Sequence, residues 1–179
     1  VDLRLSIAHS VNTYYYKLAM DLGIDRFDLY MHRYGFGEKT GIDLSGESVG
    51  VVPSPEWKRK HFKQEWFLGE TIISGIGQGY WIVTPLQLAV SYAALANGGK
   101  VMKPQLVREV RDFQGNVVEE HEPKQVADLA LDVHQLELMN EALAHVTDPG
   151  GTASGLMWKK DKFAAMSEWL REGHITIVG

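Results

Sequence analysis

The spacing of apolar residues along the chain predicts a largely helical protein. Between residues 3 and 22, apolar side chains recur every three or four positions, and Gly23 follows as a natural C-terminal cap. The stretch Ser10-Val11-Asn12 interrupts this pattern. We therefore expect a short helix, a turn at Ser10, and a second helix that runs to Asp21.

Further helices are predicted from residues that favour helix N-termini, namely Asp25, Ser54, Thr84 and Asp132. The helix after Ser54 contains the basic pair Lys58-Arg59, which is typical of a solvated face. The helix after Thr84-Pro85 is apolar on most of its faces, and such a helix belongs inside a domain.

Two segments favour extended structure. Residues 71–79 have the pattern of a strand that runs into a glycine-rich loop, and residues 101–120 that of a hairpin with its turn at 112–116. Alternating glycines at 75, 77 and 79 allow close approach of a ligand or another segment. The loop is neither a Walker loop nor a dinucleotide fingerprint, since no Gly-Lys-Ser/Thr follows and Pro85 opens the next helix.

Composition narrows the function classes. The chain has 179 residues, is 45% hydrophobic and carries a net charge of −5, which argues against a nucleic-acid partner. It has no cysteine, and its seven histidines show no metal-ligand spacing, so we expect no metal and no cofactor. No apolar run approaches the ~18 residues of a membrane span, and the first residues do not resemble a signal peptide. Because the sequence begins without Met and inside a helical pattern, we expect a piece of a longer protein.

The candidate chemistry centres on Ser10 and Asn12. If both side chains face one cleft, the hydroxyl can relay a proton while the amide holds a substrate carbonyl. Serine and asparagine at this spacing are more commonly helix caps or turn formers. The tripeptide alone therefore decides nothing.

Six stretches in order resemble the transpeptidase domain of class B penicillin-binding proteins, and within them the elongation-specific penicillin-binding protein 2 group. They are Ser10–Tyr16, Met20–Arg26, Tyr34–Leu44, Glu56–Lys58, Gly75–Trp81 with Thr84–Gln87, and Pro149–Ala153. The resemblance covers residues 1–158, which we assign to a partial transpeptidase domain. It implies an α/β (α+β) fold of the serine β-lactamase/D,D-transpeptidase type, here mainly its helical part with an inserted hairpin.

The resemblance also implies a chemistry. Members of the family attack a D-alanyl-D-alanine stem peptide with a serine, form an acyl-enzyme, and pass the acyl group to an amine, which cross-links peptidoglycan. β-Lactams acylate the same serine. By resemblance, Ser10 relays protons and Asn12 binds the substrate amide, and the loop residues Gly77, Gln78 and Gly79 are further candidates for substrate binding.

Two of the family's signatures depart from expectation. The nucleophile motif Ser-x-x-Lys should precede Ser10, but the first nine residues do not contain it, because Ser6 is followed three positions later by His9. Lys39-Thr40-Gly41 has the letters of the third motif, but it lies in the loop after the second predicted helical region rather than beyond Gly150-Gly151. We interpret Lys39 as a solvated loop lysine.

Residues 159–179 match nothing in the family, and a truncated or frameshifted gene, a gene-prediction join or an expression scar would each explain them. Two functions stay open: part of a peptidoglycan D,D-transpeptidase, or a catalytically dead remnant that is at most a binding or folding module. An unrelated helical binding protein is a third reading, against which the motif order argues. The resemblance further implies a membrane anchor outside this sequence, a location at the periplasmic face of the bacterial inner membrane, and a membrane protein of the elongation complex as partner.

Overall fold

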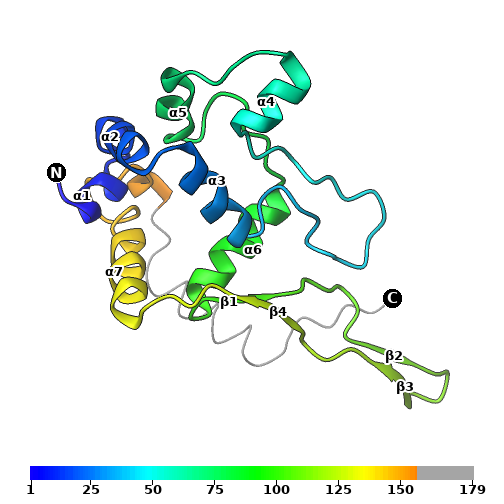
Figure 1. The fold of residues 1–179 in the computed structure, drawn as a ribbon. Helices are drawn as coiled ribbons and strands as arrows, with labels where there is room; N and C mark the ends of the chain where they lie inside the picture. Colours follow the sequence, from blue (N-terminus) through cyan, green and yellow to red (C-terminus); the bar gives the residue numbers. More distant parts are fainter. Residues whose placement is uncertain (157–179) are drawn as a thin grey trace. The chain divides into compact units, whose positions relative to one another are not determined.

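The computed structural model describes residues 1–156, so the unmatched tail at 159–179 lies outside the described residues. The chain divides into two compact units. Among the described residues, the smaller unit contains residues 1–11 and 141–156, and the larger contains residues 12–140. Figure 1 shows helices and short two-stranded sheets, which fits the expected helical part of a transpeptidase domain with an inserted hairpin.

The smaller unit begins with the short helix α1 (Leu3–Ala8). The Asp2 carboxylate caps it by accepting the Leu5 backbone N–H at 2.9 Å. Ser6 and Ala8 are buried, and the Ser6 hydroxyl donates to the Leu3 carbonyl at 2.7 Å. The predicted break in the first helical stretch is confirmed, because α1 ends before Ser10 and a separate helix begins at Asn12.

In the larger unit, α2 (Asn12–Leu22) packs against α5 (Leu68–Ser74) and contacts α3 (Ile24–Arg33). Helix α3 follows Gly23, whose φ of 76° suits glycine. The prediction that Asp25 is the N-cap of α3 is wrong. Asp25 lies inside the first turn, where its negative charge still complements the helix dipole.

Residues 71–74 are helical, so the strand predicted at 71–79 is wrong. β-Branched residues such as Ile72 and Ile73 favour strands, but the side chain of Glu70 accepts the Phe67 backbone N–H at 2.7 Å and starts a helix instead. Thr71 and Ser74, three positions apart, form the buried side of α5. Tertiary packing therefore overrides the local strand preference.

Gly75 allows the close approach of α5 to α2. A Cβ atom at this position would lie 2.6 Å from Ala19 Cβ and 2.8 Å from the Tyr15 carbonyl oxygen. The expected approach of another segment at the alternating glycines is thus found at Gly75.

Alanine substitutions at two glycines of this region are expected to have opposite effects. Gly75→Ala forces α2 and α5 apart and should lower the free energy of unfolding by about 1–3 kcal/mol. Gly69→Ala, in a helical position with nothing within 4 Å of the added Cβ, should raise it by about 0.5–1 kcal/mol. Urea unfolding of the two variants measures both effects, and equal shifts would contradict the close contact.

Helix α4 (Pro55–Phe62) is capped by the Ser54 hydroxyl, as predicted, but its basic face is not wholly solvated. Lys58 is only 1% exposed, and its ammonium lies 2.6 Å from the Glu70 carboxylate and 4.5 Å from the centre of the Phe67 ring. Burial by itself would raise the pKa of Glu70. The hydrogen bonds from Lys58 and from the Phe67 backbone outweigh burial and hold the pKa of this carboxyl below its ordinary value.

Helix α6 (Pro85–Ala96) has the predicted start, with a capping box between Thr84 and Gln87. Its buried face is more polar than expected, since Gln87, Ser91 and Ala94 are buried while Leu88 and Tyr92 are 44% and 52% exposed. The Gln87 amide donates to the Glu38 and Val49 carbonyls at 2.7 and 2.9 Å, which ties the loop of residues 35–52 to α6.

The strands form two antiparallel pairs: β1 (Lys100–Met102) with β4 (Gln125–Asp128), and β2 (Glu109–Arg111) with β3 (Val117–Glu120). The hairpin turn at 112–116 is confirmed, with Asp112 accepting the Gln114 and Asn116 N–H groups at 2.9 Å. The predicted first arm began at residue 101, but β1 pairs with β4 instead of with the hairpin. A small core of Ala94, Val101 and Leu129 joins α6 to β1 and the end of β4.

Helix α7 (Val133–Ala144) follows Asp132, whose carboxylate accepts the His134 and Gln135 N–H groups, as its predicted capping role requires. Its buried residue is Ala142. Among residues 1–156, no helix has both the length and the apolar character needed to cross a membrane.

Candidate active site

Ser10 lies in an unusual backbone conformation directly after α1. Its φ is 51°, in the left-handed region that residues other than glycine seldom adopt. The turn is closed by two backbone hydrogen bonds, from Ser10 N–H to the Ile7 carbonyl at 3.3 Å and from Val11 N–H to the Ser6 carbonyl at 3.0 Å. Glycine or asparagine is the usual residue at such a helix end, and strained backbone of this kind clusters at functional sites.

Asn12 is the first residue of α2, and its side chain is exposed. The two candidates are therefore held by different helices, with Ser10 at the end of α1 and Asn12 at the start of α2. Only Val11 separates them in the chain. The turn-then-helix arrangement that the sequence predicted for these two side chains is confirmed.

A second turn of the smaller unit contacts the turn at Ser10. The Thr152 N–H donates to the Ala8 carbonyl at 3.0 Å, and the hydroxyl oxygens of Ser10 and Thr152 lie 3.5 Å apart. These contacts join residues that are 142 positions apart in the sequence. In the sequence, Pro149–Ala153 matches the family pattern as a stretch but predicts no role for Thr152.

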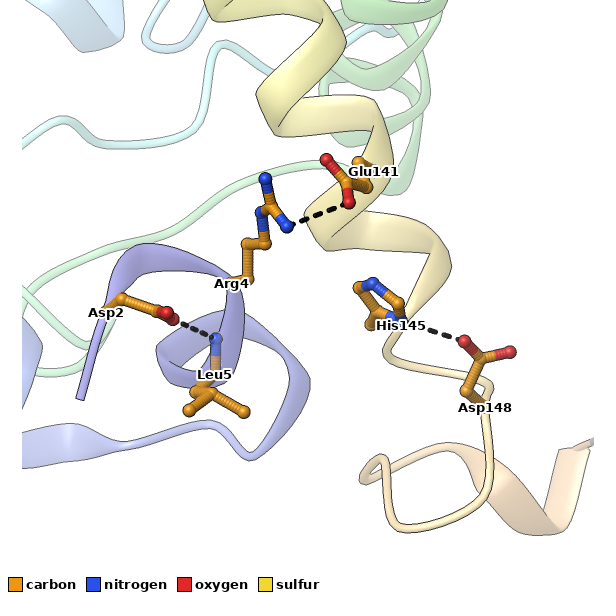
Figure 2. A network of polar contacts seen from close by, with 6 residues as sticks. All are labelled: Asp2, Arg4, Leu5, Glu141, His145 and Asp148. Atoms are coloured by element: carbon orange, nitrogen blue, oxygen red, sulfur yellow. Dashed lines mark hydrogen bonds and ion pairs between the residues drawn. The ribbon is translucent and has the colours of Figure 1, made fainter.

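Figure 2 shows the polar contacts around this region of the smaller unit. The Arg4 guanidinium forms an ion pair with Glu141 at 3.0 Å, which links α1 to α7. Nδ1 of His145 lies 2.8 Å from the Asp148 carboxylate, just before Pro149. A hollow of about 370 Å³ lies between these groups, and its polar lining consists of Asp2, Arg4, His9, His145 and Asp148.

The loop candidates Gly77, Gln78 and Gly79 follow α5 in the larger unit. The Gly77 N–H donates to the Ser74 carbonyl at 3.0 Å and the Gln78 N–H to the Ile73 carbonyl at 3.1 Å. These two backbone donors close the end of α5. All three residues are exposed, including the side chain of Gln78.

Lys39-Thr40-Gly41 lies in an irregular loop, and Lys39 is exposed. The Glu47 carboxylate accepts the Thr40 hydroxyl and N–H at 2.6 and 2.7 Å and the Gly41 N–H at 3.1 Å. The Thr40 hydroxyl, with help from these N–H groups, holds the pKa of Glu47 below its ordinary value. The segment therefore forms a closed loop and not a strand, which supports the interpretation of Lys39 as a loop lysine.

Metal ligation has no visible basis in residues 1–156, where no three His, Asp or Glu side chains gather closely enough to hold an ion. The contacts that sequence reasoning missed are Thr152 with Ser10, and Lys58 with Glu70. Both join residues that are not neighbours on one helix face. The Pro-Gly-Gly-Thr sequence was the only available signal for the first, because it marks a tight turn.

Comparison with known proteins gives consistent results. The chain is 44% identical over 121 residues to the peptidoglycan D,D-transpeptidase MrdA of Haemophilus influenzae, with 68% of the chain and 18% of the relative covered. It is 40% identical over 158 residues to the MrdA of Escherichia coli K12, with 86% of the chain and 24% of the relative covered. The chain thus spans less than a quarter of the length of each of these relatives.

Solved structures show the same likeness. The fold matches Pseudomonas aeruginosa PBP2 in complex with WCK 5153 at a TM-score of 0.72 and 39% identity, over 87% of this chain and 34% of that one. It matches PBP2 in its complex with MreC from Helicobacter pylori at a TM-score of 0.71 and 32% identity, over 86% and 27% of the two chains. The family model for the penicillin-binding protein transpeptidase domain matches residues 1–164. The chain belongs to the family of penicillin-binding protein transpeptidase domains, as its ordered motifs predicted.

Proposed function

We propose that residues 1–156 are part of a peptidoglycan D,D-transpeptidase that cross-links stem peptides during cell-wall elongation. The observation that carries the proposal is Ser10, a serine held at φ 51° directly after α1, with Asn12 two positions later in the chain as the first residue of α2. A serine whose main chain is fixed by closed backbone turns is suited to proton transfer, because its backbone needs no reorganisation when the substrate binds.

Within this function, Ser10 passes a proton to the nitrogen that leaves when the acyl-enzyme forms. It takes a proton from the incoming amine when the acyl group is transferred, so the serine itself is unchanged over the cycle. The Asn12 amide donates to the substrate carbonyl and orients it. Gly77, Gln78 and Gly79 are proposed as further substrate contacts.

The nucleophilic serine and its lysine belong to sequence other than residues 1–156 under this proposal. No Ser-x-x-Lys is present among the nine residues before Ser10, where the family pattern expects it. The segment is then inactive by itself and contributes its proton-relay residue to a larger domain. The same observation supports the second candidate, a catalytically dead remnant.

The proposal for partners and location is supported by the family's known structures. PBP2 of Helicobacter pylori forms a complex with MreC, and another matched structure is a peptidoglycan synthase complex. We propose that the protein to which this segment belongs works within an elongation complex. It acts at the periplasmic face of the inner membrane and binds β-lactams at the nucleophilic serine.

A hybrid enzyme tests the proposal. Residues 1–156 of this chain replace the matching segment of the Escherichia coli relative, which supplies the rest of the domain. The hybrid is given a stem peptide ending in D-alanyl-D-alanine together with an amine acceptor, and released D-alanine and cross-linked product are measured. We expect both products, and we expect penicillin to abolish them.

The dead-remnant alternative predicts a different outcome. A hybrid that folds, as judged by circular dichroism, but releases no D-alanine would favour the remnant and contradict the proposal. The unaltered Escherichia coli relative is the positive control.

A further inference from the structure

The contact between Ser10 and Thr152 has more support than its hydroxyl distance alone. The two hydroxyl oxygens are 3.5 Å apart, at the outer limit of a hydrogen bond. The backbone next to them is closer, since the Thr152 N–H donates to the Ala8 carbonyl at 3.0 Å. Thr152 is therefore held beside Ser10 by its main chain, and a small rotation of either side chain completes the bond.

The turn that presents Thr152 is itself fixed on its other side. The Gly151 N–H donates to the Asp148 carbonyl at 2.8 Å, and the Ala153 N–H to the Val146 carbonyl at 2.9 Å. Gly151 is buried, and a Cβ atom there would lie 2.3 Å from the Val146 carbonyl oxygen. Only glycine fits this close approach.

A third contact stabilises the same turn. The His145 ring is hydrogen-bonded to Asp148 at 2.8 Å, which joins the end of α7 to the residue whose carbonyl binds Gly151 (Figure 2). The position of Thr152 thus depends on α1 through Ala8 and on α7 through residues 145–148. Such support fixes where its hydroxyl can go.

A serine that relays protons must have its single hydrogen directed at the group that receives it. The hydroxyl can donate one hydrogen and can accept hydrogen bonds at two lone pairs. It rotates freely unless a hydrogen bond with a neighbouring group restrains it. A second hydroxyl that donates to Ser10 Oγ occupies one lone pair and turns the Ser10 hydrogen away from itself. Thr152 is placed to be that donor.

We propose that Thr152 is a positioning residue for Ser10: its hydroxyl donates to Ser10 Oγ and orients the Ser10 hydrogen toward the substrate. The inference rests on the proposed function, because it requires Ser10 to act as a proton relay. Thr152 gains and loses no proton in the reaction. Its effect lies in the geometry of the proton transfer and not in the binding of substrate.

The test compares Thr152→Val, which keeps the shape but removes the hydroxyl, with Thr152→Ser, which keeps the hydroxyl. Both variants are made in the hybrid enzyme, and acylation by a fluorescent penicillin is followed over a range of concentrations. This separates the acylation rate constant from the apparent Kd. We expect Thr152→Val to lower the rate constant about 10-fold without change in Kd, and Thr152→Ser to stay within about 3-fold of the parent hybrid.

A double-mutant comparison separates this role from a merely structural one. In a Ser10→Ala background the Thr152→Val change should have less than about a 2-fold effect, because the group that it positions is gone. An undiminished rate for Thr152→Val, or an equal loss with and without the Ser10 hydroxyl, would overturn the inference. If Ser10→Ala is slow while Thr152→Val is not, the inference fails and the proposed function stands. If Ser10→Ala itself acylates at the parent rate, the relay role of Ser10 and the inference fail together.

Discussion

Replacement of Ser10 by alanine in the hybrid enzyme is expected to slow acylation by penicillin by about 100-fold, the usual size of a lost proton-transfer group. The substitution removes the hydroxyl from the turn in which the backbone has placed it, between the end of α1 and the start of α2. The leaving nitrogen then takes its proton from water. Time courses of covalent labelling give the rate constant directly.

Ser10→Gly is the matched control for this substitution. Glycine removes the same hydroxyl but adopts φ 51° without strain, so the variant should fold at least as well as the parent hybrid and still acylate slowly. Fast acylation by Ser10→Gly would show that the hydroxyl has no part in proton transfer. The alanine effect would then be assigned to the backbone.

Substitution of Lys58 by alanine is expected to lower the free energy of unfolding of this chain by about 3–5 kcal/mol, because it leaves the Glu70 carboxylate without its partner in a largely buried site. The side chains of Lys58 and Glu70 are 2% and 15% exposed. The aliphatic part of Lys58 and its contact with the Phe67 ring are lost at the same time. Urea unfolding followed by circular dichroism measures the change.

The adjacent residue provides a control on the same helix. Arg59 pairs with Glu65 at 3.3 Å, but both side chains are more than half exposed, so Arg59→Ala should change the free energy of unfolding by less than about 1 kcal/mol. The double variant Lys58→Met with Glu70→Gln should recover much of the loss of Lys58→Ala, since neither charge is left alone. Equal losses for Lys58→Ala and Arg59→Ala would contradict the burial of Lys58.

The elements that the sequence predicted correctly are those whose signals are local. Thr84 and Gln87 form their capping box within four residues, and Asp112 closes its hairpin turn through the N–H groups of residues 114 and 116. Ser54 likewise caps α4 through Trp57, three residues on. Such hydrogen bonds depend on side-chain type and spacing, which can be read from a sequence.

The elements that were missed depend on distant parts of the chain. Ile72 and Ile73 favour a strand, but these residues form helix α5 because that helix packs against α2 through Gly75. The sequence predicts Lys58 to be a surface cation. In the structure it is buried against Glu70 of α5 and against Phe67, the residue before α5. The Gln87 amide binds carbonyls at residues 38 and 49, so a polar residue became part of the buried face of α6.

The candidate site divides in the same way. Ser10 and its turn were predicted, because the break in helical periodicity and the polar side chains of Ser10 and Asn12 all lie within the first twelve residues. Thr152 was not assigned a role, because its contact with Ser10 spans 142 positions. A contact between residues so far apart in the chain leaves no periodic pattern in the sequence.

Covalent labelling with a fluorescent penicillin, read on a denaturing gel after boiling, tests the central claim most directly. The claim is that residues 1–156 supply the relay serine of a penicillin-acylated transpeptidase whose nucleophile lies in other sequence. The chain of 179 residues and the hybrid enzyme are incubated side by side. We predict no labelled band for the chain and a stable labelled band for the hybrid, and a labelled band for the chain by itself would contradict the claim.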